Sequence, residues 1–107
     1  MLTDMKCSHI DKTTKPMPAA EADKKMGEIP GWSLEYPSLA RDYKFKDFTG
    51  AMQFANRVAG LAEQEDHHPD LHISYNRVRL ELSTHSIGGL SMNDFIMAAK
   101  INALQGE

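Results

Sequence analysis

The sequence predicts an α+β fold in which a four-stranded antiparallel sheet has three helices packed on one face, in the order α-β-β-α-β-β-α. The main observation is that apolar and polar residues alternate over four short segments, which is the period of half-buried strands. The segments occur in two pairs, and neither pair is separated by enough residues for a crossover, so each is expected to form an antiparallel hairpin. Three segments with helical character supply the cover that one apolar sheet face requires.

The chain is expected to begin with an arm that precedes a single domain over residues 18–107. Residues 1–17 mix charge, Ser, Thr and Pro without a helical or alternating pattern, which predicts a loose N-terminal arm. The first helix is expected from Pro18 to about Met26, because proline suits the first helical position and the alanines that follow are good helix formers. Gly27 then ends this helix.

The first hairpin and the long helix follow directly. Strands are expected at Trp32–Tyr36 and Arg41–Lys46, separated by a proline-containing turn. Asp47 is placed to cap the next helix. The helix carries one apolar stripe over four turns, which is expected to face the core, formed by Phe48, Ala51, Met52, Ala55, Val58, Ala59 and Ala62.

The second hairpin and the last helix complete the pattern. Alternation resumes at Leu71 and continues through Leu82, which predicts the third and fourth strands. Paired glycines then provide a turn. The last helix opens at Ser91, whose spacing to Asp94 resembles a capping box.

Length, charge and cysteine content exclude several classes of protein. The chain has 107 residues, which suits one domain, and a formal net charge of −3, without the basic surplus of nucleic-acid-binding proteins. Its longest apolar runs are far shorter than the roughly 20 residues of a membrane span. Cys7 is the single cysteine and cannot form an internal disulfide, and no export signal opens the sequence, so a reducing, cytoplasmic location is expected.

Histidines are the chemically informative residues. His67 and His68 follow the long helix, and His85 ends the last strand, so all three lie at the ends of elements, where binding groups commonly sit. Imidazole has an unperturbed pKa of about 6.5 and exchanges protons near neutrality. Three such groups around one pocket would suit a reaction made only of proton transfers. Acidic neighbours such as Asp66, Glu63 or Asp94 would orient the rings.

Two other roles remain open for these histidines. His67 and His68 are also placed to cap the long helix, whose dipole favours positive charge at its C-terminal end. A metal site is the second alternative, because His68, Asp70 and His72 alternate in an extended segment and His85 is available as a fourth ligand. No phosphate-binding or dinucleotide-binding glycine motif and no Gly-x-Ser-x-Gly motif is present.

One set of residues resembles the signature of a known enzyme family. The set consists of Glu63, His67, His68, Pro69, Tyr75, His85 and Asp94. This pattern resembles that of the pterin-4a-carbinolamine dehydratases, and the similarity runs from about residue 19 to residue 103. A pattern of several parts with fixed gaps is more specific than a His-His pair alone.

The resemblance implies both a fold and an activity. The family fold is a four-stranded antiparallel sheet with helices on one face. The family activity is a hydro-lyase reaction that dehydrates 4a-hydroxytetrahydrobiopterin, left when aromatic amino acid hydroxylases use tetrahydrobiopterin, to quinonoid dihydropterin. The resemblance implies no metal, no organic cofactor, and assembly as a homodimer or homotetramer. A non-enzymatic pterin-binding or protein-partner module is the alternative.

The resemblance also implies roles for particular residues. His67, His68 and His85 are expected to be catalytic, with one ring acting as the acid on the departing 4a-hydroxyl and another accepting the proton lost from the pterin ring. The residues expected to bind or orient the substrate are Asp66, Ser83, Thr84, Ser86, Glu63, Asp94 and Trp32. Among these, Glu63 and Asp94 are expected to orient or cap, while Trp32 is expected either to wall the pocket or to be buried in the core.

Overall fold

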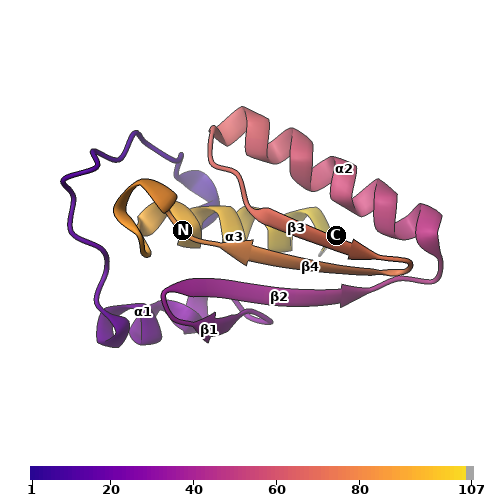
Figure 1. Ribbon diagram of the computed structural model, residues 1–107, viewed down its shortest axis with the longest axis horizontal. Coiled ribbons are helices and arrows are strands. Elements are labelled where there is room, and N and C mark those ends of the chain that lie inside the picture. The colour runs from indigo at the N-terminus through magenta and orange to yellow at the C-terminus, as the bar shows by residue number, and fades with distance from the viewer. Residues whose placement is uncertain (106–107) are drawn as a thin grey trace.

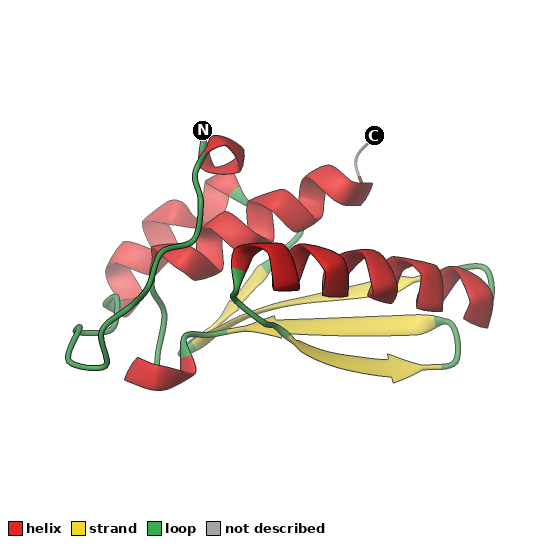
Figure 2. Ribbon diagram, turned by 90° about the horizontal axis from the view of Figure 1, so that it is seen from above, coloured by secondary structure: helices red, strands yellow, loops and turns green. Residues whose placement is uncertain are grey.

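The computed structural model describes residues 1–105 and confirms the expected order of elements (Figure 1). Four strands form one sheet in the order β1-β2-β4-β3, and each neighbouring pair is antiparallel. The helices lie on one side of this sheet (Figure 2). The elements are α1 (Ala19–Lys25), β1 (Ser33–Glu35), β2 (Ser38–Lys44), α2 (Phe48–Glu65), β3 (Asp70–Ser74), β4 (Arg77–Leu82) and α3 (Met92–Gln105), with 3-10 turns η1 (Leu2–Asp4), η2 (Met26–Glu28) and η3 (His85–Ile87).

The covered face of the sheet follows the alternation expected from the sequence. Val78, Leu80 and Leu82 of β4 are all buried. The register places Leu82 opposite Leu39 of β2 and Leu80 opposite Leu71 of β3. Apolar cross-strand pairs of this kind stabilise an antiparallel sheet, and the residues between them point to the opposite, polar face.

Helix α2 begins after the expected cap. The Asp47 carboxylate accepts a hydrogen bond from a backbone N–H of the first turn at 2.8 Å. The apolar stripe differs from the expected one at its margins, because Phe48 and Ala59 are exposed and Phe54 is buried. Phe54 packs on the Tyr43 ring of β2 with 4.5 Å between centroids, which turns the buried side of α2 toward it. The buried residues are Ala51, Phe54, Ala55, Val58, Ala62 and Glu65.

Helix α3 lies in the middle of the core and is buried on nearly all sides. Its expected capping box is confirmed with aspartate in place of the more usual glutamate: the Ser91 N–H donates to Asp94 Oδ2 at 3.0 Å. The Ser91 hydroxyl accepts from the Asn93 N–H at 3.3 Å. Across residues 1–105 we find no helix with the length and apolar character needed to traverse a bilayer.

Residues 1–17, expected to form a loose arm, are exposed over most of their length but are attached to the domain at several points. Leu2 and Met17 are buried at the two ends of this segment. The Met17 N–H donates to the Leu90 carbonyl at 2.8 Å, and the Tyr36 hydroxyl donates to the Met17 carbonyl at 2.6 Å. The attachment depends on single apolar residues and backbone groups, which leave no periodic pattern in the sequence.

Candidate active site

Antiparallel pairing brings the histidine segments together. Asp70 opens β3 and pairs with Glu81, which lies next to the end of β4. Residues 66–69, just before β3, therefore lie beside residues 83–86, just after β4. An isolated bridge at Thr84 then turns the chain back toward α3. The ends of α2 and β4 and the start of α3 meet at one place in the fold.

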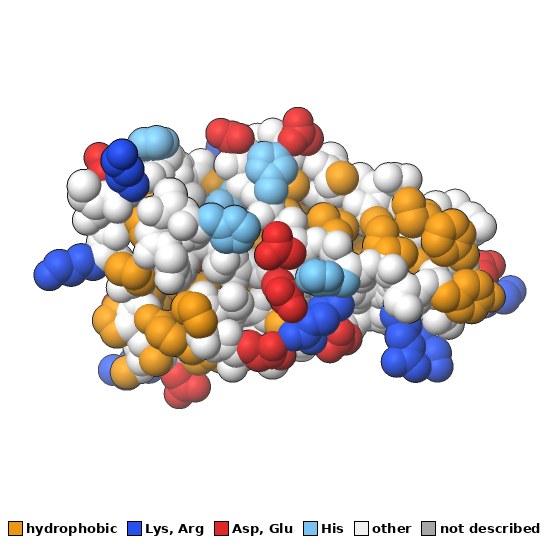
Figure 3. Space-filling view, in the orientation of Figure 1, with side chains coloured by type: hydrophobic (Ala, Val, Ile, Leu, Met, Phe, Trp, Pro, Cys, Tyr) orange, Lys and Arg blue, Asp and Glu red, His pale blue; other side chains and the backbone are white. Residues whose placement is uncertain are grey.

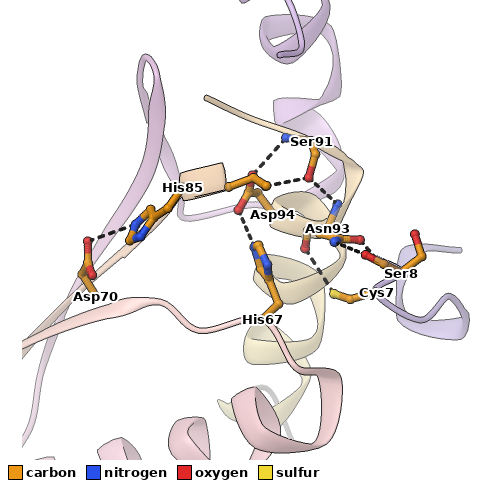
Figure 4. A network of polar contacts seen from close by, with 9 residues as sticks. Cys7, Ser8, His67, Asp70, His85, Ser91, Asn93 and Asp94 are labelled. Atoms are coloured by element: carbon orange, nitrogen blue, oxygen red, sulfur yellow. Dashed lines mark hydrogen bonds and ion pairs between the residues drawn. The ribbon is translucent and has the colours of Figure 1, made fainter. Parts of the chain in front are cut away.

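A left-handed residue sets the direction of the chain at His67. Asp66 has φ 53° and ψ 42°, which ends α2 abruptly, and aspartate tolerates this conformation better than most residues. The His67 N–H donates to the Ala62 carbonyl at 3.2 Å, a bond across five residues that is typical of a Schellman helix ending. This closure directs the His67 ring away from α2 and toward α3 (Figure 4).

All three predicted catalytic histidines line one cavity. The cavity has a volume of about 220 Å³ and is lined by Asp66, His67, His68, Ser83, Thr84, His85 and Ser86. The structure therefore brings together the three histidines and four of the residues expected to bind substrate. Figure 3 shows the molecule in the same orientation as Figure 1, and on this face several histidine side chains lie close together with acidic side chains between them.

His67 and Asp94 form a buried pair at the base of this cavity. The His67 Nε2 atom lies 2.7 Å from Asp94 Oδ1, with side-chain exposures of 10% and 0%. Asp94 Oδ2 accepts from the Thr84 hydroxyl at 2.9 Å and from the Ser91 N–H at 3.0 Å (Figure 4). The carboxylate thus caps α3 and fixes the His67 ring, and the α3 dipole favours its negative charge.

The Asp94 contact also selects the proton position on His67. A carboxylate accepts hydrogen bonds, so the neutral His67 ring carries its proton on Nε2 and leaves Nδ1 with a lone pair. When the ring is protonated, the same carboxylate stabilises the imidazolium. This arrangement is suited to moving a proton at Nδ1.

His68 and His85 also have carboxylate partners, but these pairs are exposed. His68 Nε2 lies 2.6 Å from Glu63 Oε2, and His85 Nε2 lies 3.8 Å from Asp70 Oδ2. More than half of each of these four side chains is exposed, so each pair contributes about 0–1 kcal/mol to stability. These two rings lie at the rim of the cavity, and solvent reaches them, whereas His67 is held inside.

Three of the residues expected to bind or orient the substrate do not line the cavity. Glu63 and Asp94 do not line the cavity but contact histidines that do. Trp32 is not brought to the cavity. It is buried in the core, and its indole N–H donates to Asn102 Oδ1 at 2.9 Å, eight residues along α3 from Asp94, or about 12 Å.

The arrangement separates the residues of the alternative metal site. His72 points to the polar face of the sheet, where its Nε2 lies 3.8 Å from Glu81 Oε1. His68 precedes β3 and contacts Glu63 instead. Within residues 1–105, no group of three His, Cys, Asp or Glu side chains is arranged to hold a metal ion.

Asp70 is an ion-pair partner of His85, whereas the sequence suggested these two residues together only as candidate ligands of the alternative metal site. Fifteen positions separate the two residues in the sequence. Their proximity depends on the register between β3 and β4, which periodicity does not provide. The sequence linked the two residues only through the alternation that suggested a metal site with His85 as a fourth ligand.

Comparison with known proteins identifies the family. The family model of pterin 4 alpha carbinolamine dehydratase matches residues 15–104. The chain therefore belongs to this family. The match covers the sheet, α2 and nearly all of α3, and hence every residue that lines the cavity.

Individual relatives and a solved structure support the same family assignment. A protein of Hydrogenovibrio crunogenus, provisionally named pterin-4-alpha-carbinolamine dehydratase, is 41% identical over 96% of this chain and 93% of its own length. A Sulfolobus acidocaldarius protein with the same provisional name is 48% identical over 79% of this chain and 93% of its own. The crystal structure of a Brucella melitensis transcriptional coactivator/pterin dehydratase superposes with TM-score 0.77 and 36% identity, over 84% of this chain and 98% of that one.

A more distant structure shares the fold alone. It is a pterin dehydratase-like protein described as a RuBisCO assembly factor in the alpha-carboxysome, with TM-score 0.57 and 18% identity. It covers 92% of this chain and 99% of that one. The same architecture therefore occurs in proteins with different roles, and the function must be argued from the site.

Proposed function

We propose that this protein is a 4a-hydroxytetrahydrobiopterin dehydratase, which converts the 4a-carbinolamine to quinonoid dihydropterin and water. The observation that carries the proposal is the convergence of His67, His68 and His85 on one cavity in a chain of the pterin 4 alpha carbinolamine dehydratase family. After a separate two-electron reduction to the tetrahydro form, the product would return to use by aromatic amino acid hydroxylases in the cytoplasm.

The reaction needs only proton transfers, which matches the groups present. The C4a–O bond breaks as an imidazolium protonates the hydroxyl, which leaves as water. The ring N–H next to C4a gives its proton to a second, neutral imidazole, and the freed electron pair forms a C=N double bond. Nothing is oxidised or reduced. Each positioned acid or base of this kind contributes about 10²–10⁴-fold to a rate.

The three rings have different surroundings and hence different uses. His67 is fixed by Asp94 and presents Nδ1 as a defined acceptor or donor. His68 and His85 are exposed at the rim and exchange protons with solvent. Ser83, Thr84 and Ser86 supply hydroxyl and backbone groups along the same cavity for holding a flat polar heterocycle. No metal or organic cofactor is part of this proposal.

The test is to follow chemically generated 4a-hydroxytetrahydropterin spectroscopically against its decay in buffer. The wild-type chain is expected to accelerate the decay, and His67→Ala, His68→Ala and His85→Ala are each expected to lower kcat by about 10²-fold or more. His72→Ala is the matched control, because His72 lies on the polar sheet face. Wild-type rates in all three variants would contradict the proposal, and pterin binding without acceleration would indicate a binding module.

We also propose that the chain assembles as a homodimer or homotetramer. Ile73, on the edge strand β3, and Tyr75, in the turn that follows it, are 40% and 67% exposed, and Phe48 at the start of α2 is 50% exposed. An apolar patch is visible at this end of the molecule (Figure 3). Exposed edges and apolar patches favour association. Light scattering coupled to size-exclusion chromatography measures the oligomer mass, and a monomer at micromolar concentration would contradict this.

A further inference from the structure

A second cavity lies directly beside the histidine cavity. It has a volume of about 300 Å³, and it shares Asp66, His67, Thr84 and Ser86 with its neighbour. Its remaining walls come from Glu65, from Asn93 and from the N-terminal arm, residues Cys7 to Ile10. The arm therefore faces the His67 side of the candidate active site.

The arm is fastened to the same two elements that position the site. The Ser8 N–H donates to Asn93 Oδ1 at 3.0 Å, and Asn93 Nδ2 donates to the Ser8 carbonyl at 2.7 Å. The Cys7 N–H donates to Glu65 Oε1 at 2.9 Å. Asn93, which contacts Ser8 in Figure 4, directly precedes Asp94 on α3. Glu65 comes two residues before His67. The arm is therefore attached next to both members of the His67–Asp94 pair.

The volumes indicate that the two cavities serve one ligand. Sites for small molecules commonly have volumes of about 300–1,000 Å³, and the histidine cavity alone falls below that range. A flat pterin ring placed between the histidines would have room for its substituent past the shared residues, in the arm cavity. That cavity presents polar side chains, with Ser8 and His9 on the arm and Asn93 on α3.

We propose that residues 7–10 of the arm form part of the substrate site and bind the short hydroxylated substituent of the pterin, with His9 and Ile10 as specificity-determining contacts. This inference depends on the proposed function for the identity of the substrate. His9 is exposed and Ile10 is half-buried, so both side chains remain available to a ligand. Truncating either one leaves the core and the arm's hydrogen bonds in place.

The kinetic test compares two substrates that differ only in the substituent. These are the 4a-hydroxy forms of tetrahydrobiopterin, which carries a dihydroxypropyl group, and of 6-methyltetrahydropterin. His9→Ala and Ile10→Ala are expected to raise KM for the first about threefold to tenfold, with kcat within about twofold. KM for the 6-methyl substrate should not change. His72→Ala is the control with a matched loss of imidazole.

A merely structural role of the arm would not change the ratio of the two KM values, because a displaced arm would affect both substrates alike. A ratio that stays at the wild-type value in both His9→Ala and Ile10→Ala would overturn the inference. A ratio of the biopterin KM to the 6-methyl KM that rises about threefold to tenfold in either variant would support it.

A second measurement separates this inference from the proposed function. Cys7 is the only cysteine and lines the arm cavity, so maleimide labelling followed by mass spectrometry reports on that cavity. If the wild type accelerates the decay of neither substrate, the proposed dehydratase function is contradicted. The labelling experiment then tests by itself whether the arm cavity binds a pterin. Slowing of the labelling by 7,8-dihydrobiopterin, by about fivefold or more, and less by its 6-methyl analogue then supports the arm site. Equal labelling with and without the pterins overturns it.

Discussion

The Nε2 atom of His67 lies 2.7 Å from Oδ1 of Asp94, and Asp94 is completely buried. The two residues come from the loop after α2 and from the first turn of α3. Asp94 is therefore both the cap of a core helix and the partner of a cavity-lining ring. Changes at this carboxylate should affect stability and activity together, whereas changes at the rim should affect activity alone.

Asp94→Asn tests this coupling. The asparagine side chain has one oxygen and one NH₂ group, but three donors face the carboxylate: the His67 ring, the Thr84 hydroxyl and the Ser91 N–H. One donor must then face another donor. We expect a loss of about 1–3 kcal/mol in the free energy of unfolding, measured by urea denaturation. We also expect kcat to fall at least about tenfold, because His67 loses its orienting charge.

The matched control for this variant is Asp23→Asn, which alters an exposed aspartate on α1. It should change the free energy of unfolding by less than about 0.5 kcal/mol. If Asp94→Asn keeps wild-type stability and kcat, the buried pair has no functional importance.

Asp70→Asn probes the exposed pair at the rim. The Asp70 carboxylate lies 3.8 Å from His85 Nε2, and both side chains are more than half exposed. Stability should therefore change by less than about 0.5 kcal/mol. We expect kcat to fall between about twofold and tenfold, much less than in His85→Ala, because the carboxylate orients the ring without holding it tightly. A loss equal to that of His85→Ala would indicate instead that Asp70 contacts the substrate.

Chelation tests the proton-transfer character of the reaction. Since the proposed step breaks one C–O bond and moves two protons, kcat should be the same before and after dialysis against EDTA. Elemental analysis of active protein should give less than about 0.1 metal ion per chain, because a structural or catalytic site would approach one. A loss of activity that zinc or magnesium restores would contradict the mechanism.

The sequence is a good guide to this fold for a physical reason. Strand alternation and the caps at Asp47 and Ser91 depend on neighbours within a few residues, and the structure confirms them. The prediction of which α2 residues are buried was less accurate at the margins of the apolar stripe, because burial of Phe54 depends on the Tyr43 ring across the sheet–helix interface.

The site was predictable in its chemistry and less so in its geometry. Imidazoles at the ends of elements made His67, His68 and His85 candidates, and the resemblance to a known family then implied a catalytic role for all three. The Asp70 partner of His85 requires the strand register, and the arm beside His67 is attached through isolated contacts such as the Ser8–Asn93 pair. Such single contacts have no period and leave no trace in a sequence pattern.

Glu65 makes the attachment of the arm sensitive to acid. Its carboxylate, 2% exposed, accepts from Lys100 Nζ at 2.8 Å and from the Cys7 N–H at 2.9 Å. These hydrogen bonds, the Lys100 contact foremost, lower the pKa of Glu65 below its usual value. A lowered pKa in the folded state stabilises the protein above the unfolded-state pKa of about 4.3, and this stabilisation is lost as pH falls through the folded-state pKa.

Glu65→Gln should therefore destabilise the protein at pH 7 by about 1–3 kcal/mol, and the difference from wild type should shrink as pH falls from about 5. Urea denaturation at pH 7 and near pH 4 measures both values. Burial and then the Glu65 charge raise the pKa of the Cys7 thiol to about 12, so the variant should also react faster with maleimide at pH 8. A difference in unfolding free energy that is the same at both pH values would show that the Glu65 charge does not hold the arm.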